Sequence, residues 1–298
     1  MAKKRKLEQA GPLSPSTLKE LEARMEVEFV YNTNSIEGSK LSRGETELVM
    51  RGMTVKGKSI ADVLAAKNHP DAIKLVKELA FGKGEITARN ILDIHGIIMA
   101  GIISTAGEYR RGDVNIGGAS FTPPPAYQVG AEMEELFEFV NKNPDELRAI
   151  ELAAHAHYFL TWIHPFDDGN GRMARLLLNF ILVRNRYPFA IVKHVEQKKY
   201  LTTLADADEG DFEPFIVYIA RCVEQTLDLY LLAIEGERGE KPALMPLGEL
   251  AEGTPYSAEY LSLLARKGAL DAVKVGRIWM STKKTIDTYI AEHGNKPA

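Results

Sequence analysis

Apolar residues recur along most of the chain at spacings of three and four, the pattern of amphipathic and buried helices. One segment, 108–129, breaks this pattern: the triplets VNI and ASF flank Gly117-Gly118, and three prolines follow. Paired glycines between short apolar runs indicate a β-hairpin. The chain is therefore predicted to be mainly α-helical with one small hairpin. The helices are expected over residues 15–35, 43–53, 60–80, 87–101, 130–142, 145–163, 171–186 and 211–235.

A stretch rich in charge, glycine and proline, residues 235–246, marks a boundary near the C-terminus. Beyond it we expect a short helix, a turn at 253–255, a second helix, a strand pair around AVKVGRIWMS and a last helix. That order is typical of a small helix-turn-helix or winged domain. Residues 243–298 carry seven Lys/Arg against six Asp/Glu, so their charge does not favour DNA over a protein partner.

Composition narrows the class of protein. Of 298 residues, 45% are hydrophobic and 26% charged, and the net charge is −4, which is typical of a globular protein and does not indicate a general nucleic-acid or membrane-surface binder. The single cysteine, Cys222, excludes an internal disulfide and is expected to be a buried core thiol. The sequence has no long uncharged apolar run and no apolar signal region at its start. We therefore expect a cytoplasmic protein with no membrane partner.

Between two apolar segments lies HPFDDGNGRMAR, residues 164–175, which is too rich in charge for a plain turn. Gly169-Asn170-Gly171 would form the turn that opens the next helix, where backbone N–H groups and the helix dipole favour a bound anion. Arg172 and Arg175 are three residues apart, so both can project from one face of the first turn. Two arginines at the positive end of a helix indicate an anionic ligand or partner.

The same loop carries two further groups with a chemical use. Asp168 stands directly before the glycines and could hold Mg²⁺ on bound phosphates. His164, at the exit of the preceding helix, has a pKa suited to accepting a proton near neutral pH. The alternative interpretation, a polar turn with an Asp–Arg pair, explains fewer of these residues.

The loop resembles the signature H-x-F-x-[DE]-G-N-G-R-x-x-R of Fic-domain proteins at every fixed position. The similarity covers roughly residues 25–200 and includes GEYRRGDVNIGG, which is similar to the segment leading into the family's flap. The resemblance implies an N-terminal helical region, a helical catalytic core with a flap, a linker, and a winged helix-turn-helix-like domain. These would span residues 1–80, 81–235 (flap about 110–122), 236–244 and 245–298.

The resemblance implies transfer of AMP from ATP to a Ser, Thr or Tyr hydroxyl of a target protein, or of the chain itself. His164 would deprotonate that hydroxyl, and Asp168 would hold Mg²⁺ or Mn²⁺ between the α- and β-phosphates. Phe166 would anchor the loop in the core. The flap would pair with an extended target segment as an added strand. Its expected residues are Val114, Asn115, Ile116, Gly117 and Gly118.

The remaining motif residues would bind the nucleotide. By the resemblance, the backbone of Gly169, Asn170 and Gly171 forms an anion hole, and Asn170 orients the α-phosphate. Arg172 would hold the leaving phosphates and Arg175 the γ-phosphate.

A second match concerns regulation. TNSIEG, residues 33–38, fits the family's inhibitory pattern [ST]-x-x-x-E-[GN] at the end of a helix expected over about 15–38. Glu37 would pair with Arg175 and fill the space that the γ-phosphate needs. Taken alone, Glu37-Gly38 is merely a helix stop.

Three alternatives stay open at this point. Two of them would use the same site: removal of AMP from a target, and transfer of another nucleotide. The third is a DNA-binding regulator whose Fic core senses nucleotide. A homodimer would be in keeping with the family, and His95 is expected to be a satisfied core histidine.

Overall fold

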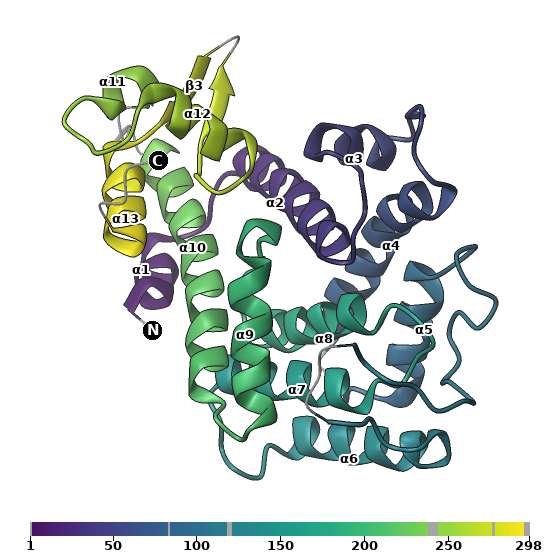
Figure 1. Cartoon of the computed structure of the whole chain (residues 1–298). Coiled ribbons are helices and arrows are strands. Elements are labelled where there is room, and N and C mark those ends of the chain that lie inside the picture. The colour runs from purple at the N-terminus through teal and green to yellow at the C-terminus, as the bar shows by residue number, and fades with distance from the viewer. Residues whose placement is uncertain (1, 83, 118–120, 238–243, 276–277, 295–298) are drawn as a thin grey trace. The chain divides into compact units, whose positions relative to one another are not determined.

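The computed structural model describes residues 2–82, 84–117, 121–237, 244–275 and 278–294, and these are mainly helical (Figure 1). The first helices are α1 (Ala2–Ala10), α2 (Pro15–Ile36), α3 (Arg43–Met50), α4 (Ile60–Gly82) and α5 (Ala88–Ile98). They are followed by α6 (Val129–Lys142), α7 (Ala149–Ile163), α8 (Asn170–Arg184), α9 (Gln197–Asp208) and α10 (Glu213–Glu237). The last part of the chain holds β1 (Met245–Pro246), α11 (Leu247–Ala251), α12 (Ala258–Arg266), β2 (Val273–Val275), β3 (Ile278–Ser281) and α13 (Lys283–His293).

The eight helices expected up to residue 235 are all present, with ends within four residues of those predicted. The sequence pattern missed α1 and α9. Helix α1 buries none of its residues, so no apolar stripe marks it. Helix α9 buries a narrow stripe, Tyr200, Thr203 and Ala207, of which one residue is polar.

The chain divides into two compact units. The first contains Met1–Arg5 and Lys19–Asp228, and the second contains Lys6–Leu18 and Leu229–Ala298. No described helix is both long and apolar enough to cross a membrane.

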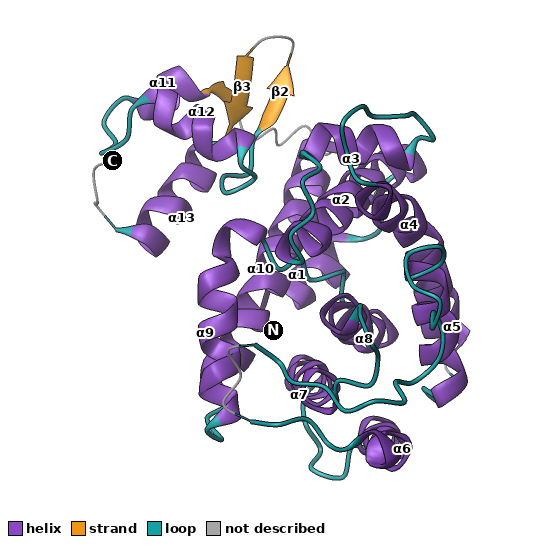
Figure 2. Cartoon of the chain, turned by 45° about the vertical axis from the view of Figure 1, so that its right-hand side comes forward, coloured by secondary structure: helices purple, strands orange, loops and turns teal. Residues whose placement is uncertain are grey.

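Helices α7 and α8 form the centre of the first unit. Figure 2 views them nearly end-on and side by side, with other helices around them. Helix α8 buries every residue from Arg172 to Val183, and a helix that is buried all round belongs in the middle of a core. Helices α4 and α5 pack against α8, and α6 packs against α7. The loop between α7 and α8 is thus held at both ends by rigid elements.

The last turn of α2 is buried although it is polar. Asn32, Thr33, Asn34 and Ser35 are each less than a tenth exposed. Buried polar groups require partners, and the Asn32 side chain accepts the His194 N–H at 2.8 Å and donates to the Glu28 carbonyl at 2.8 Å. The helix ends at Ile36, so Glu37 follows directly from this buried polar turn.

The structure describes only part of the expected flap. Val114, Asn115, Ile116 and Gly117 form loop and turn without a strand, and Gly118 lies outside the described residues. The described part of the flap is therefore an irregular segment on the surface.

The second unit contains the expected short helix, second helix, strand pair and last helix. Strands β2 and β3 pair antiparallel, with Lys274 opposite Trp279. Strand β1, which the sequence pattern did not predict, pairs with the other side of β3. The core of this unit is formed by Leu247, Leu250, Tyr256, Leu261, Leu264, Ala265, Leu270 and Ile286. Of the expected linker 236–244, residues 238–243 lie outside the described residues.

Candidate active site

The loop between α7 and α8 turns sharply at both ends. His164 ends α7 in the left-handed region, with φ 51° and ψ 57°, a conformation that disfavours any side chain and that gathers at functional sites. Gly169 precedes α8 with φ 84°. A Cβ at Gly169 would also lie 2.8 Å from Met99 Sδ. Position 169 therefore requires glycine for both conformation and space.

An aromatic stack and a histidine hold this loop in place. Phe166 is fully buried and stacks on His95, with ring centroids 3.6 Å apart and planes 9° from parallel. Nδ1 of His95 accepts the Gly107 N–H at 2.9 Å, so neutral His95 carries its proton on Nε2 and donates it to the Asp168 carbonyl at 3.0 Å. Burial lowers the pKa of His95 to about 4, which keeps the ring neutral at physiological pH. His95 is satisfied, as expected, and it also fixes the loop.

The start of α8 has the features that favour a bound anion. Gly169 provides no side-chain cap, so the first N–H groups of the helix lack partners within it, at the positive end of its dipole. A Cβ on Gly171 would overlap the Glu37 carboxylate. Only glycine at 171 lets an anion approach this turn so closely, and in the structure the Glu37 carboxylate lies there.

Arg175 joins α8 to the end of α2. The guanidinium is 2% exposed; its Nη2 donates to Glu37 Oε1 at 2.6 Å, and its Nε donates to Thr33 Oγ1 at 2.7 Å. Glu37 itself is 36% exposed. Burial lowers the pKa of Arg175, but Glu37 and Tyr200 together raise it by more, so this pKa lies above its usual value. The first and fifth residues of the TNSIEG segment thus bind one buried cation.

Arg172 is a second buried cation at this helix start. Its side chain is 7% exposed, and its Nη2 lies 3.2 Å from Asp168 Oδ1. Its Nε is buried with no hydrogen-bond partner among the described residues. Leaving a buried charged donor unpaired costs free energy, and an anion at the start of α8 would offset that cost.

The Asn170 side chain bonds to the backbone of Phe166. Its Oδ1 accepts the Phe166 N–H at 2.9 Å, and its Nδ2 donates to the Phe166 carbonyl at 2.8 Å. These two bonds close the loop and use one of the two amide hydrogens. The other amide hydrogen, and the backbone N–H of Asn170 at the first position of α8, can still meet a phosphate, so the orienting of an α-phosphate by Asn170 stays a prediction.

Asp168 lies at the exposed edge of the loop. Its carboxylate is 54% exposed, and Oδ1 accepts the Gly169 N–H at 2.5 Å. No group of three His, Cys, Asp or Glu side chains within the described ranges could hold a metal ion by itself. Mg²⁺ is commonly held by one or two carboxylates together with substrate phosphates and water. One exposed carboxylate beside an anion position fits that arrangement.

His164 is set up as a proton acceptor. Nδ1 lies 3.2 Å from the Thr161 carbonyl, which can only accept, so Nδ1 carries the proton and Nε2 holds the lone pair. Burial lowers the pKa of His164 below its ordinary value, Arg110 lowers it further, and Glu37 and Asp168 oppose the shift. The neutral, basic form therefore predominates near pH 7.

Sequence reasoning missed Arg110. This side chain is buried, and it donates to the carbonyls of His164 at 2.7 Å, Gly112 at 2.9 Å and Pro124 at 2.5 Å. One guanidinium thus ties both ends of the flap segment to the histidine of the loop. The sequence offers no sign that Arg110 rather than the exposed Arg111 has this position, because the two are adjacent in GEYRRG.

Three further side chains with possible chemistry, His155, His157 and Cys222, pack against neighbouring residues. The Tyr200 hydroxyl lies 2.9 Å from His157 Nε2, and burial lowers the pKa of His157 to about 3. His155 packs on Phe212 with centroids 4.5 Å apart. Cys222 is a buried free thiol, and burial raises its pKa to about 12, as expected for a packed rather than reactive cysteine.

Comparison with known proteins gives the family. The profile of the Fic/DOC family matches residues 85–182. A protein adenylyltransferase Fic of Aedes aegypti is 34% identical over 267 residues, which is 88% of this chain and 53% of that protein. The chain thus spans about half the length of the curated relatives it matches.

Solved structures of Fic-domain proteins have a similar fold. A Fic-domain signalling protein from Bacteroides thetaiotaomicron has a TM-score of 0.73 and 30% identity, with 80% of this chain and 97% of that chain covered. Residues 134–508 of Fic-1 from C. elegans give a TM-score of 0.71 and 29% identity, with 78% and 72% covered. On sequence, fold and motif together, the chain belongs to the Fic/DOC family.

Proposed function

We propose that the chain is a protein adenylyltransferase that transfers AMP from ATP to a hydroxyl side chain of a target protein, or of itself, and that Glu37 restrains it. The observation that carries the proposal is the uncapped start of α8, where Arg172 has a buried unpaired Nε and Arg175 is a buried cation. These positively charged groups favour binding of a polyanion. The activity named for the relatives supports the same conclusion.

His164 performs the proton transfer. Its Nε2 lone pair accepts the proton of the target hydroxyl as the hydroxyl oxygen bonds to the α-phosphorus of ATP. The bond from that phosphorus to the bridging oxygen of the β-phosphate breaks, and pyrophosphate leaves. Phosphoryl-type transfer depends mainly on positioning and charge stabilisation, with one base for the nucleophile.

The start of α8 provides the charge stabilisation. First-turn N–H groups and Arg172 would bind the α- and β-phosphates, where negative charge builds up on the leaving group. Asp168 would hold Mg²⁺ or Mn²⁺ shared with those phosphates, and the ion would supply further positive charge.

Glu37 would restrain the reaction by occupying the position of the γ-phosphate. Its carboxylate lies at Gly171 and on Arg175, the position assigned to the γ-phosphate. A nucleotide that binds beside Glu37 would present its α-phosphate out of line with the hydroxyl. Displacing the carboxylate is the step that would activate the enzyme.

The target would dock on the flap segment, residues Val114–Gly118. Its backbone is held at both ends by Arg110 and can offer hydrogen bonds to an extended chain. DNA binding by the second unit and formation of a homodimer are further parts of this proposal.

The test uses ATP labelled on the α-phosphate, with Mg²⁺, and with lysate as the source of targets. Wild type, Glu37→Gly, and Glu37→Gly with His164→Ala are compared. We expect strong labelling of protein by Glu37→Gly, weak labelling by wild type and none by the double variant. Equal labelling by wild type and Glu37→Gly would contradict restraint. No labelling by any variant would contradict AMP transfer and would favour AMP removal, tested next on labelled protein.

A further inference from the structure

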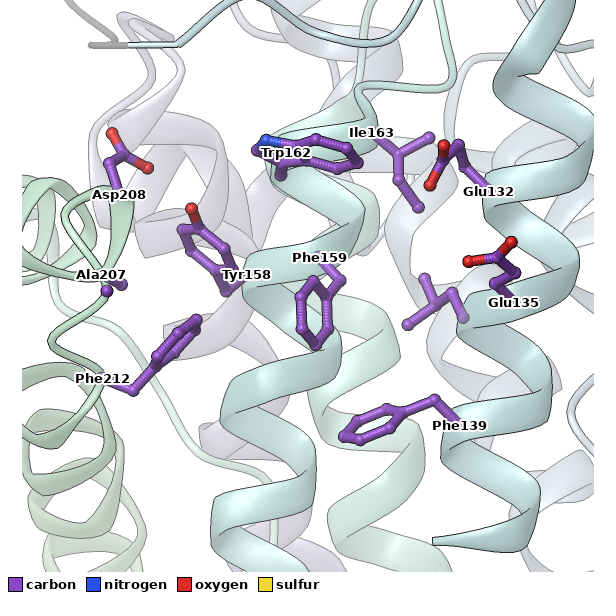
Figure 3. Close-up of a pocket in the computed structure, with 12 residues that line it drawn as sticks. Glu132, Glu135, Phe139, Tyr158, Phe159, Trp162, Ile163, Ala207, Asp208 and Phe212 are labelled. Atoms are coloured by element: carbon purple, nitrogen blue, oxygen red, sulfur yellow. The ribbon is translucent and has the colours of Figure 1, made fainter. Parts of the chain in front are cut away.

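A cavity of about 410 Å³ lies in the first unit, between α6, α7 and the segment 207–212 (Figure 3). Its volume is in the range of pockets that bind small molecules or single side chains. No step of the proposed reaction uses it.

Five of the twelve residues that line the cavity are aromatic. Tyr158 and Phe212 meet edge to face with centroids 4.9 Å apart, and Phe139 and Phe159 do so at 5.6 Å. Rings that support each other in this way hold a preformed shape. Trp162 adds the largest aromatic face.

Carboxylates flank these rings on two sides. Figure 3 shows Glu132 and Glu135, from α6, on one side and Asp208, beside the phenol of Tyr158, on the other. Burial and the nearby Asp208 charge raise the pKa of Tyr158 to about 12, so its hydroxyl stays protonated. None of the described residues that line the cavity is basic. The cavity is therefore complementary to a cation with an apolar body.

The cavity adjoins the site proposed for the target. Trp162 contacts Phe121, at the end of the flap segment, with centroids 6.3 Å apart. Trp162 and Ile163 line the cavity and directly precede His164. Trp162 is two residues from His164, so their Cα atoms are at most about 7 Å apart. Two residues of an extended target peptide cover the same distance.

We propose that this cavity binds the side chain of an arginine or lysine of the target protein, within roughly four residues of the hydroxyl that receives AMP. The proposal rests on the function proposed above. The aromatic faces attract the cation and pack on its methylene stem, while the carboxylates balance its charge. An acidic side chain would be repelled, and an apolar one would gain nothing from the charge of the carboxylates.

The first experiment measures preference. The chain with Glu37→Gly is incubated with α-labelled ATP and peptides that have one central Ser, Thr or Tyr and random flanks. We expect arginine and lysine to be enriched at least fivefold at one or two flanking positions. Glu132→Gln with Glu135→Gln should reduce that enrichment at least threefold. The matched control is Glu134→Gln, an exposed glutamate on α6 outside the cavity, which should leave it unchanged.

The second experiment measures binding without the reaction. The chain has two tryptophans, so Trp279→Phe leaves Trp162 as the only one. We expect saturable change of its fluorescence with acetyl-arginine amide, at least fivefold weaker in the Glu132→Gln, Glu135→Gln background, and no saturation with acetyl-leucine amide.

The two experiments separate the two proposals. Binding of the arginine probe with no peptide labelled would contradict AMP transfer and support the cavity. Three results would each overturn the inference and leave AMP transfer in place. They are labelling of peptides without a preference for basic residues, a preference that the double variant keeps, and failure of the arginine probe to bind.

Discussion

Replacing Glu37 by glutamine removes the one carboxylate bound to buried Arg175 and keeps the side chain's size. Breaking a fully buried pair costs about 3–5 kcal/mol and an exposed one about 0.2–1. Glu37 is 36% exposed while Arg175 is 2% exposed, so screening by solvent reduces the larger figure. We expect the free energy of unfolding without nucleotide to fall by about 1–2 kcal/mol, which lowers Tm by roughly 2–8 °C.

The free energy of the Glu37–Arg175 pair also affects the affinity for ATP. In the wild type, the γ-phosphate reaches Arg175 only by displacing Glu37, and a nucleotide that binds beside Glu37 forgoes its contact with Arg175. Either way, binding is weakened by about the strength of the Glu37–Arg175 pair. The variant has no carboxylate to displace, so its Kd for ATP should be about 5- to 30-fold lower, since every 1.4 kcal/mol is tenfold. The increase of Tm on adding ATP should also be larger in the variant.

The assay is thermal unfolding with and without Mg²⁺–ATP, together with calorimetric titration of ATP. The matched control is Glu28→Gln, which removes an ion pair between Glu28, on α2, and Arg43 away from the loop. The control should lose stability and keep the wild-type Kd. An unchanged Kd in Glu37→Gln, or an equal change in both variants, would refute the reasoning that Glu37 occupies the phosphate position.

Three further predictions concern other parts of the site. Arg110→Lys should lower kcat at least tenfold with an unchanged Kd for ATP, because Arg110 binds flap and loop carbonyls rather than the start of α8; a parallel loss of ATP binding would contradict this. Asp168→Asn should raise the half-maximal Mg²⁺ concentration about tenfold or more, and an unchanged requirement would remove Asp168 from the metal site. The free energy of unfolding should fall as the pH drops below about 6.5, because three buried histidines have folded-state pKa values of about 3 to 4 and are neutral in the fold. Each histidine lowers the free energy of unfolding by about 1.4 kcal/mol per pH unit until the pH reaches its folded-state pKa. Urea unfolding at pH 7.5, 6 and 5 measures this loss, and a flat profile would contradict it. The histidines are His69, His95 and His157.

The chemistry of the loop was readable because it is local. Gly169, Gly171, Arg172 and Arg175 stand within seven residues, and helical spacing alone places them on one turn. The helices on both sides were readable for the same reason, since a period of 3.6 needs only neighbours along the chain. The hairpin of the flap stays a prediction, because residues 118–120, at its expected turn, lie outside the described residues.

The sequence by itself determined which groups the site contains: a base, a carboxylate, glycines at a helix start and two arginines. Only the tertiary structure decided how they are used. It bonds the Asn170 amide to the loop and brings Glu37 to Arg175 across 138 residues, and it makes Arg110 and His95 supports of that loop. The reason is physical: backbone spacing sets which residues share one turn, whereas contacts between distant segments depend on how all the helices pack at once.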